Sequence, residues 1–329
     1  IFAYLIAKKE FNSEITARIS LLILSVYPNH IAYCSLLSSE VLFLFLITCG
    51  TFFILEIKDH FIFAPLSGIA FGFACLVKIQ AILLPILVFT VKFFKVEKRK
   101  IQMDNFYRFV TLYTALVMTI LPWLIRNFIA FGRLVFSTNG GINLYIGNNP
   151  ESTGTWMAIP PELANIADEI TRDAVARDLA INYIFTHPVE TVLRIPVKLF
   201  YALLDFDGFS WNEDSIAFLT SEAHVLFLLL KIISELFYVS CLCLFVLFFI
   251  HQFKNGELRK IPKLGSGFII YFLLITVGFF GIQRFHFAII PWIVLYGSNF
   301  LEKLIHKNSE SQEAPSITER EEKNSIHLE

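Results

Sequence analysis

Long apolar runs, separated by short charged breaks, constrain this chain more than any other feature of its sequence. A helix of about 20 apolar residues covers the hydrocarbon core of a bilayer. Such runs dominate the sequence on both sides of one polar stretch, Arg126 to Glu222. Hydrophobic residues make up 56% of the 329 residues, and the mean hydropathy is +0.63. The pattern predicts an all-α polytopic membrane protein, a transmembrane helix bundle with one larger outer-face segment.

The lengths of the apolar runs predict about eight spans. They are Ile15–Tyr27, Val41–Leu55, Phe61–Val77, Ile79–Phe94, Phe106–Ile125, Val225–Ile250, Gly267–Ile282 and Phe285–Phe300. Pro28 is expected to end the first of them, and Ile31 to Ser39 is expected to be a turn region. Ile1 to Ala7 reads as the tail of a further apolar helix. Because the first residue is not Met, we expect the chain to be a fragment.

Four regions follow from these runs. Transmembrane helices are expected over residues 1–125 and 223–302, an outer-face segment with amphipathic helices over 126–222, and a disordered cytoplasmic tail over 303–329. Alternate loops carry Lys and Arg, among them the cluster Lys92 to Lys100. The positive-inside rule assigns that set of loops to the cytoplasm and the polar stretch to the opposite side.

The polar stretch contains its own helical patterns. Apolar residues from Leu163 to Ala174 recur at helical spacing among charged ones, which predicts an amphipathic helix. Pro188 is expected in the first turn of a helix. Val189 to Leu204 is expected to lie in the headgroup region as a helix with a kink at Pro196.

Three charged residues lie at the predicted outer ends of spans, where charges are costly unless they are paired or hydrated. Glu40 begins a helix, Lys78 divides two apolar helices, and Arg284 lies at the tip of the last hairpin with His286 beside it. Two cations at the headgroup plane can hold a phosphate, so these four residues are candidates for donor binding. The alternatives are a favourable helix dipole for Glu40 and snorkelling for the two cations.

A second group of candidates for the site wall surrounds the sequence NGGINLYIGNN. Gly and amide side chains can hydrogen-bond a polar ligand there. The group comprises Arg126, Asn127, Asn139, Tyr145 and Asn148. The alternatives are an anchored helix end for Arg126 and Asn127, and a surface turn for the loop.

Other classes of site find little support. The His and Cys residues lack metal-ligand spacing, and the five cysteines fall in or beside apolar runs, which favours small buried residues. A net charge of −1 shows no nucleic-acid footprint.

Four motifs, in order, resemble those of bacterial integral-membrane glycosyltransferases with the GT-C fold, relatives of protein O-mannosyltransferases and the lipid A aminoarabinose transferase. They are YPNHIAYCSLLSSEVLFLFL, LSGIAFGFACLVKIQAILLPILV, PWLIRNFIAFGRLVFSTNGGINLYIGNNPESTG and QRFHFAIIPWIVL. The second motif carries Lys78 where the family more often has Arg.

The resemblance implies transfer of a sugar from a polyprenyl-phosphate donor to a glycan, lipid or protein acceptor. It places the chain in a bacterial inner (plasma) membrane with its site on the periplasmic or extracellular side. It also implies a catalytic acidic residue in the first outer loop, which is expected upstream of Ile1. The cofactor stays open: the lipid-linked sugar is the donor substrate, and a divalent metal is compatible with the resemblance, although no residue pattern points to one.

Two other functions remain open at this stage. A lipid or sugar transporter or flippase would show broken helices and charges near mid-membrane. A non-catalytic membrane scaffold would show neither donor turnover nor translocation.

Overall fold

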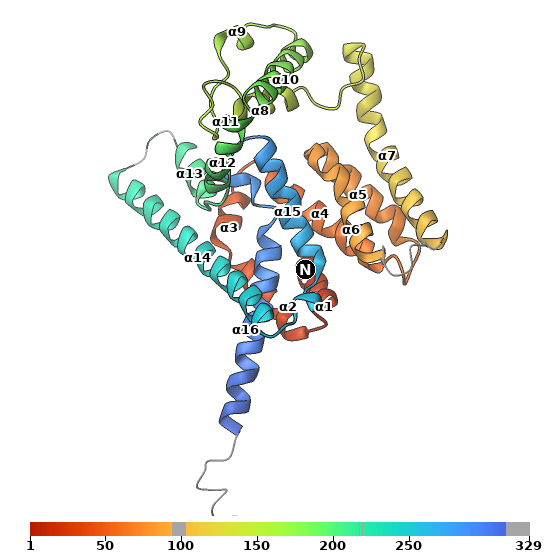
Figure 1. Cartoon of the computed structure of the whole chain (residues 1–329), viewed down its shortest axis with the longest axis vertical. Helices are drawn as coiled ribbons and strands as arrows, with labels where there is room; N and C mark the ends of the chain where they lie inside the picture. The colour runs from red at the N-terminus through yellow and green to blue at the C-terminus, as the bar shows by residue number, and fades with distance from the viewer. Residues whose placement is uncertain (94–102, 217, 219, 314–329) are drawn as a thin grey trace, which may run out of the picture.

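The computed structural model describes residues 1–93, 103–216, 218 and 220–313, and these residues form an assembly of α-helices (Figure 1). No β-strand occurs in these ranges; a single bridge joins Thr155 to Gly281. The predicted class, an all-α membrane protein, is confirmed. The cluster Lys95 to Lys100 lies outside the described residues.

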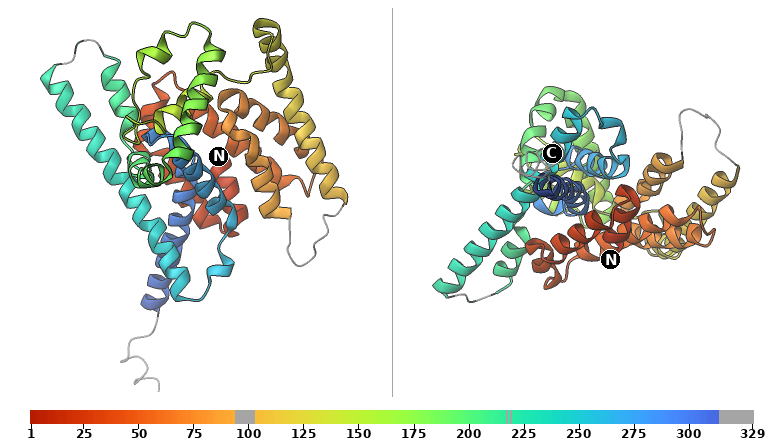
Figure 2. Two further views of the ribbon diagram at one scale, coloured as in Figure 1. Left: turned by 45° about the horizontal axis from the view of Figure 1, so that its top comes forward. Right: turned by 90° about the horizontal axis from the view of Figure 1, so that it is seen from below.

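Among the described residues, three helices are long and apolar enough to cross a membrane: α4 (Ser39–Glu56), α7 (Met103–Phe131) and α14 (Ser221–Lys254). Only 17% and 22% of the most apolar stretches of α7 and α14 are buried in the protein. Apolar helices that face outward in this way are expected to contact lipid. Seen from below, α14 and the α5–α7 group project to different sides of the chain (Figure 2).

Four of the other predicted spans form shorter helices: α2 (Glu14–Ser25), α5 (Phe63–Val77), η1 (Ile79–Leu83) with α6 (Leu84–Phe93), and α15 (Lys263–Gly278). The last predicted span, Phe285–Phe300, falls on η4 (Gln283–Phe285) and the first half of α16 (Ile290–Glu313), and the apolar tail expected at Ile1 belongs to α1 (Phe2–Phe11). By length and composition, three described helices, where about eight spans were expected, could cross a membrane. At 1.5 Å per residue, a 15-residue helix such as α5 is roughly 22 Å long, less than the hydrocarbon core. Lys78, in extended backbone, divides α5 from η1.

The segment after Pro28 was predicted wrongly. Pro28 begins a helix, α3 (Pro28–Cys34), because proline fits the first helical turn, where its missing N–H costs nothing. The break between α2 and α3 therefore lies just before Pro28, at Tyr27. Only the residues after Cys34 form the expected turn.

The last helix runs through the core. The first half of α16 (Ile290–Glu313) is buried against α14 and α2. The helix continues to Glu313, so residues 303–313, expected in a disordered tail, are helical. Residues 314–329 lie outside the described part of the chain.

Loops that the charge alternation assigned to one membrane side meet at one end of the structure. Lys9 Nζ lies 2.8 Å from Glu56 Oε1, and Glu10 pairs with Lys92. Ser13 Oγ donates a 2.6 Å hydrogen bond to Glu302. These contacts bring α1, the ends of α4 and α6 and the second half of α16 together, while the polar stretch lies at the opposite end (Figure 1).

The described residues between α7 and α14 form six short or medium helices. They are α8 (Gly140–Gly147), α9 (Pro161–Ala164), α10 (Glu169–Thr186), α11 (Pro188–Leu193), α12 (Ile195–Ala202) and α13 (Asp207–Asp214). The helix expected from Leu163 to Ala174 is broken before Asp168, whose side chain caps α10 by accepting from the Thr171 N–H. Pro188 starts α11 as predicted, and Pro196 belongs to the first turn of α12, so a break replaces the kink.

Close packing of α5 on α7 depends on small residues. A Cβ added at Gly68 would lie 2.1 Å from the carbonyl oxygen of Leu112, and Gly72 faces Thr119 one turn further on. This small-xxx-small pattern lets two membrane helices approach closely.

We therefore expect Gly68→Ala to destabilise the protein by about 1 to 3 kcal/mol through overpacking. Gly140→Ala, where the added Cβ meets nothing within 4 Å, is the matched control and should be neutral or slightly stabilising. Melting temperatures of the two variants in the same detergent test this. Equal melting temperatures would contradict the close contact between α5 and α7 at Gly68.

Candidate active site

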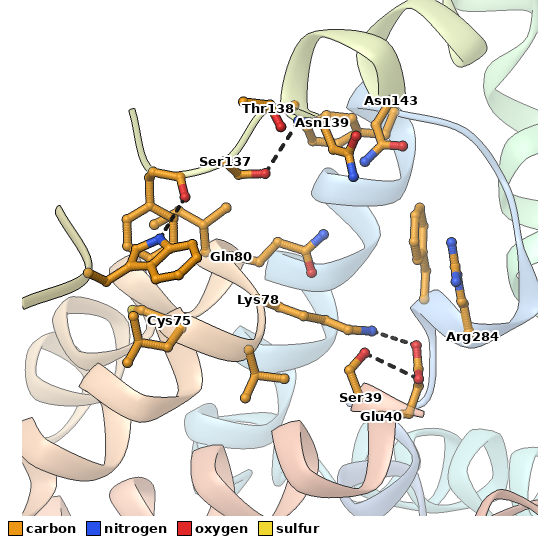
Figure 3. Close-up of a pocket in the computed structure, with 18 residues that line it drawn as sticks. Ser39, Glu40, Cys75, Lys78, Gln80, Ser137, Thr138, Asn139, Asn143 and Arg284 are labelled. Atoms are coloured by element: carbon orange, nitrogen blue, oxygen red, sulfur yellow. Dashed lines mark hydrogen bonds and ion pairs between the residues drawn. The ribbon is translucent and has the colours of Figure 1, made fainter. Parts of the chain in front are cut away.

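A cavity of about 610 Å³ opens where the polar stretch meets the helix ends (Figure 3). Its wall comes from the start of α4, the α5–η1 junction, the loop before α8 and the segment around η4 (Gln283–Phe285). The predicted residues Glu40, Lys78 and Arg284 line it together, with Asn139 opposite. The structure thus brings together, in one cavity, three charges that lie up to 244 positions apart in the sequence (284 − 40).

Glu40 and Lys78 form an ion pair at the floor of this cavity. Lys78 Nζ lies 2.7 Å from Glu40 Oε1, and Glu40 is only 3% exposed. Glu40 lies in the first turn of α4, where the helix dipole favours a negative charge. Lys78 is placed by the break between α5 and η1. Each charge therefore offsets the burial of the other.

Arg284 differs from Lys78 because no carboxylate lies within ion-pair distance of it in the described part of the chain. Its guanidinium carbon lies 5.5 Å from the ring centre of Trp211 and 6.0 Å from that of Phe285. Of the residues lining the cavity, Glu40, Lys78 and Arg284 are the charged ones, two cations and one anion. The cavity therefore has one excess positive charge, which suits an anionic ligand.

Uncharged polar groups form the opposite wall. Gln80, Ser137, Asn139 and Asn143 carry amides or hydroxyls toward the cavity (Figure 3). The loop that carries Ser137 and Asn139 is tied to α7, because Trp123 Nε1 donates a 2.9 Å hydrogen bond to the Phe136 carbonyl.

Four predicted wall residues lie outside this cavity. Arg126 donates a 2.9 Å hydrogen bond to Asn127 Oδ1 and stacks on Trp123, 5.3 Å from the ring centre. Asn127 in turn donates to the Val135 carbonyl. These two residues therefore tie the end of α7 to the loop that follows it. Tyr145 and Asn148, on and after α8, also do not line the cavity.

His286 also lies away from the cavity. Its ring is 1% exposed, and Nε2 lies 2.9 Å from Asp205 Oδ1. His286 follows η4 directly, two residues after Arg284, but it does not line the cavity. Trp211 and Asp205 were not anticipated, since no local motif marks either one. No group of three or more His, Cys, Asp or Glu side chains within the described ranges is arranged to hold a metal.

Asn148 takes part in a buried set of hydrogen bonds that joins the polar stretch to α15. Lys198 is fully buried; Nζ donates 3.0 Å hydrogen bonds to Asn148 Oδ1 and to the Val277 carbonyl. No carboxylate in the described part of the chain pairs with it. Burial, with a further contribution from the charge of Arg194, lowers the pKa of Lys198 to about 8.

The lowered pKa of Lys198 predicts the direction in which the free energy of unfolding changes with pH. Above about pH 8 the folded protein releases the Lys198 proton, while the unfolded chain keeps it up to its ordinary pKa of 10.5. The free energy of unfolding of the wild type should therefore rise with pH, relative to Lys198→Met, by about 1.4 kcal/mol per unit between roughly pH 8 and 10. Paired melting curves across this range measure the difference. A difference that stays constant with pH would contradict the buried, unpaired ammonium.

Comparison with known proteins gives one match. Residues 1–125 match the family model described as dolichyl-phosphate-mannose-protein mannosyltransferase. No curated protein and no solved structure matches the chain. Together with the apolar helices, the match supports a membrane glycosyltransferase. It places residues 1–125 in this family of GT-C-type glycosyltransferases, which confirms the resemblance that the sequence motifs indicated.

Proposed function

We propose that this protein transfers a sugar from a polyprenyl-phosphate-linked donor to an acceptor on the outer face of the membrane. The observation that carries the proposal is the cavity with one excess positive charge, lined by Arg284 at the end of a bundle of apolar helices. The description of the matched family names a lipid-phosphate sugar of this chemical class. A glycan, a lipid or a protein remains possible as the acceptor.

Arg284 is the group best suited to hold the donor phosphate. A guanidinium binds phosphate through two parallel hydrogen bonds, and this one has no carboxylate partner to displace in the described structure. Stacking on Trp211 and Phe285 keeps its planar fork oriented. Because low-dielectric helices surround the cavity, water competes less for the phosphate than it would at an exposed arginine.

The remaining wall residues have distinct proposed roles. Lys78 supplies a second cation but stays bound to Glu40, so this pair mainly organises the site. Glu40 is buried and neutralised by Lys78, which makes it a poor general base. Amides of Gln80, Asn139 and Asn143 offer donors and acceptors for sugar hydroxyls. The volume, about 610 Å³, lies in the range of small-ligand pockets, roughly 300 to 1,000 Å³.

Substitution of Arg284 tests the proposed donor site. Arg284→Ala should reduce donor affinity or transfer rate roughly tenfold to a hundredfold, since a charge-assisted hydrogen bond contributes about 1.5 to 3 kcal/mol. Arg284→Lys should recover part of the loss, because an ammonium lacks the planar fork. Arg133→Ala, an exposed arginine on the polar stretch, is the control and should have little effect.

The measurement is transfer of labelled sugar from its polyprenyl-phosphate carrier in reconstituted membranes, with matched amounts of each variant. Wild-type donor kinetics in Arg284→Ala would rule out the donor-site assignment. Translocation of the labelled donor without transfer would instead favour the transporter alternative.

The side of the membrane is a separate proposal, supported by the gathering of the basic loops at one end. In a variant without the five native cysteines, a cysteine at position 165 on the polar stretch should react with an impermeant thiol reagent added outside. A cysteine at position 58, in the α4–α5 connection, should react only after the membrane is opened. The reverse pattern of labelling would place the cavity on the cytoplasmic side.

A further inference from the structure

We infer that Asp205 and His286 are positioning residues that hold Arg284 in the cavity. This inference rests on the proposed function only for its effect on transfer; the geometry that it describes is independent of the donor. The pair lies outside the cavity: Asp205 is in the connection between α12 and α13, and His286 directly follows η4.

Asp205 is the fixed end of the pair. It is 1% exposed, and all of its hydrogen-bonding groups have partners. Oδ1 accepts from Asn29 at 2.7 Å and lies 2.9 Å from His286 Nε2, while Oδ2 accepts from the Tyr27 hydroxyl at 2.7 Å. Its N–H donates to Glu235 Oε2, and its carbonyl accepts from Ser234 Oγ. Contacts from the α2–α3 region and α14 therefore hold this carboxylate in one place.

The segment that carries Arg284 has little stability of its own. The helix η4 is three residues long, and a 3₁₀ turn of this size has poor hydrogen-bond geometry. Its backbone bonds include those from Phe285 N to Ile282 O and from His286 N to Gln283 O. The buried imidazole of His286, bound to Asp205, is thus the side-chain anchor that fixes the end of this turn.

The same network places the ring on which Arg284 stacks. Trp211 belongs to α13, and hydrogen bonds at the start of α13 hold it to α3. The Tyr33 hydroxyl donates a 2.5 Å hydrogen bond to Asp207 Oδ2, and the Gly208 N–H donates a 2.9 Å bond to Asn29 Oδ1. Asn29 donates to both Asp205 and Asp207. One buried network therefore sets both η4 and Trp211, the two supports of Arg284.

Charge reinforces the anchor. The titratable groups around His286 are Asp205, Asp207, Glu235, His30 and Tyr238. Burial acts to lower the pKa of His286, but the hydrogen bond and charge of Asp205 and the charge of Asp207 outweigh it, so the pKa is raised. The imidazole is therefore more readily protonated than a free histidine, and the charged form pairs with Asp205. That attraction is present at lower pH and is lost as pH rises through the folded pKa.

Arginine footprinting tests the inference without a donor. Phenylglyoxal modification of Arg284, measured by peptide mass spectrometry relative to exposed Arg133 in the same sample, reports how firmly the guanidinium is held. We expect His286→Gln, which removes the charge, and Asp205→Asn to raise this ratio several-fold. His187→Gln, an exposed histidine on the polar stretch, is the matched control and should leave it unchanged.

Tyr27→Phe removes a single hydroxyl from Asp205 and covers the case in which the stronger variants fail to fold. It should raise the ratio by a smaller factor. An unchanged ratio in every variant that elutes and melts as a folded protein would overturn the positioning role.

Kinetics separate this inference from the proposed function. If both hold, His286→Gln should raise the donor KM about tenfold, with a smaller change in kcat, because Arg284 then meets the phosphate in the wrong place. A raised footprint ratio together with wild-type transfer by Arg284→Ala would support the positioning role while rejecting the donor site. A raised donor KM with an unchanged footprint ratio would reject positioning and leave the donor site standing.

Discussion

The pairing of charge at the edge of an apolar bundle is the constraint on which the site depends. An unpaired Glu40 at 3% exposure would be strongly destabilising, and the 2.7 Å contact with Lys78 removes that cost. The contact also ties the start of α4 to the break between α5 and η1. Arg284 can then remain without a carboxylate because it faces the cavity and stacks on aromatic rings. Because the Glu40–Lys78 pair is neutral overall, the unpaired Arg284 gives the cavity its net positive charge.

The apolar helix bundle and the polar stretch each contribute a different part of this site. Apolar helices provide a surface for lipid and hold Glu40 and Lys78 at their ends. The polar stretch covers these ends with amides and hydroxyls, and its helices α12 and α13 reach back to α15 and α3 through buried polar contacts. Lys198 and Asp205 are the centres of those contacts. Neither centre faces the cavity, yet each fixes a segment beside it.

Much of the fold could be predicted from the sequence because apolar runs and charge breaks are local signals. The gathering of Glu40, Lys78 and Arg284 could be anticipated too, since loop alternation assigned all three to one membrane side. The number of full spans could not be predicted. Hydropathy alone does not show where short apolar helices such as α5 and α15 end. The segment after Pro28 was misread because proline serves equally well to end one helix or to begin the next.

The part of the site that the sequence did not predict rests on contacts between distant residues. Asp205 is bound by Asn29, 176 positions away, and by His286, 81 positions away, and no local pattern marks such partners. His286 lies two residues after Arg284 in sequence, yet it is buried against Asp205 and does not line the cavity.

The most direct measurement is a cryo-EM structure of the protein with a non-hydrolysable polyprenyl-phosphate sugar analogue. This account predicts that the phosphate lies within hydrogen-bond distance of the Arg284 guanidinium and that the Glu40–Lys78 pair is intact. A phosphate bound elsewhere, with Arg284 turned away from it, would contradict the account.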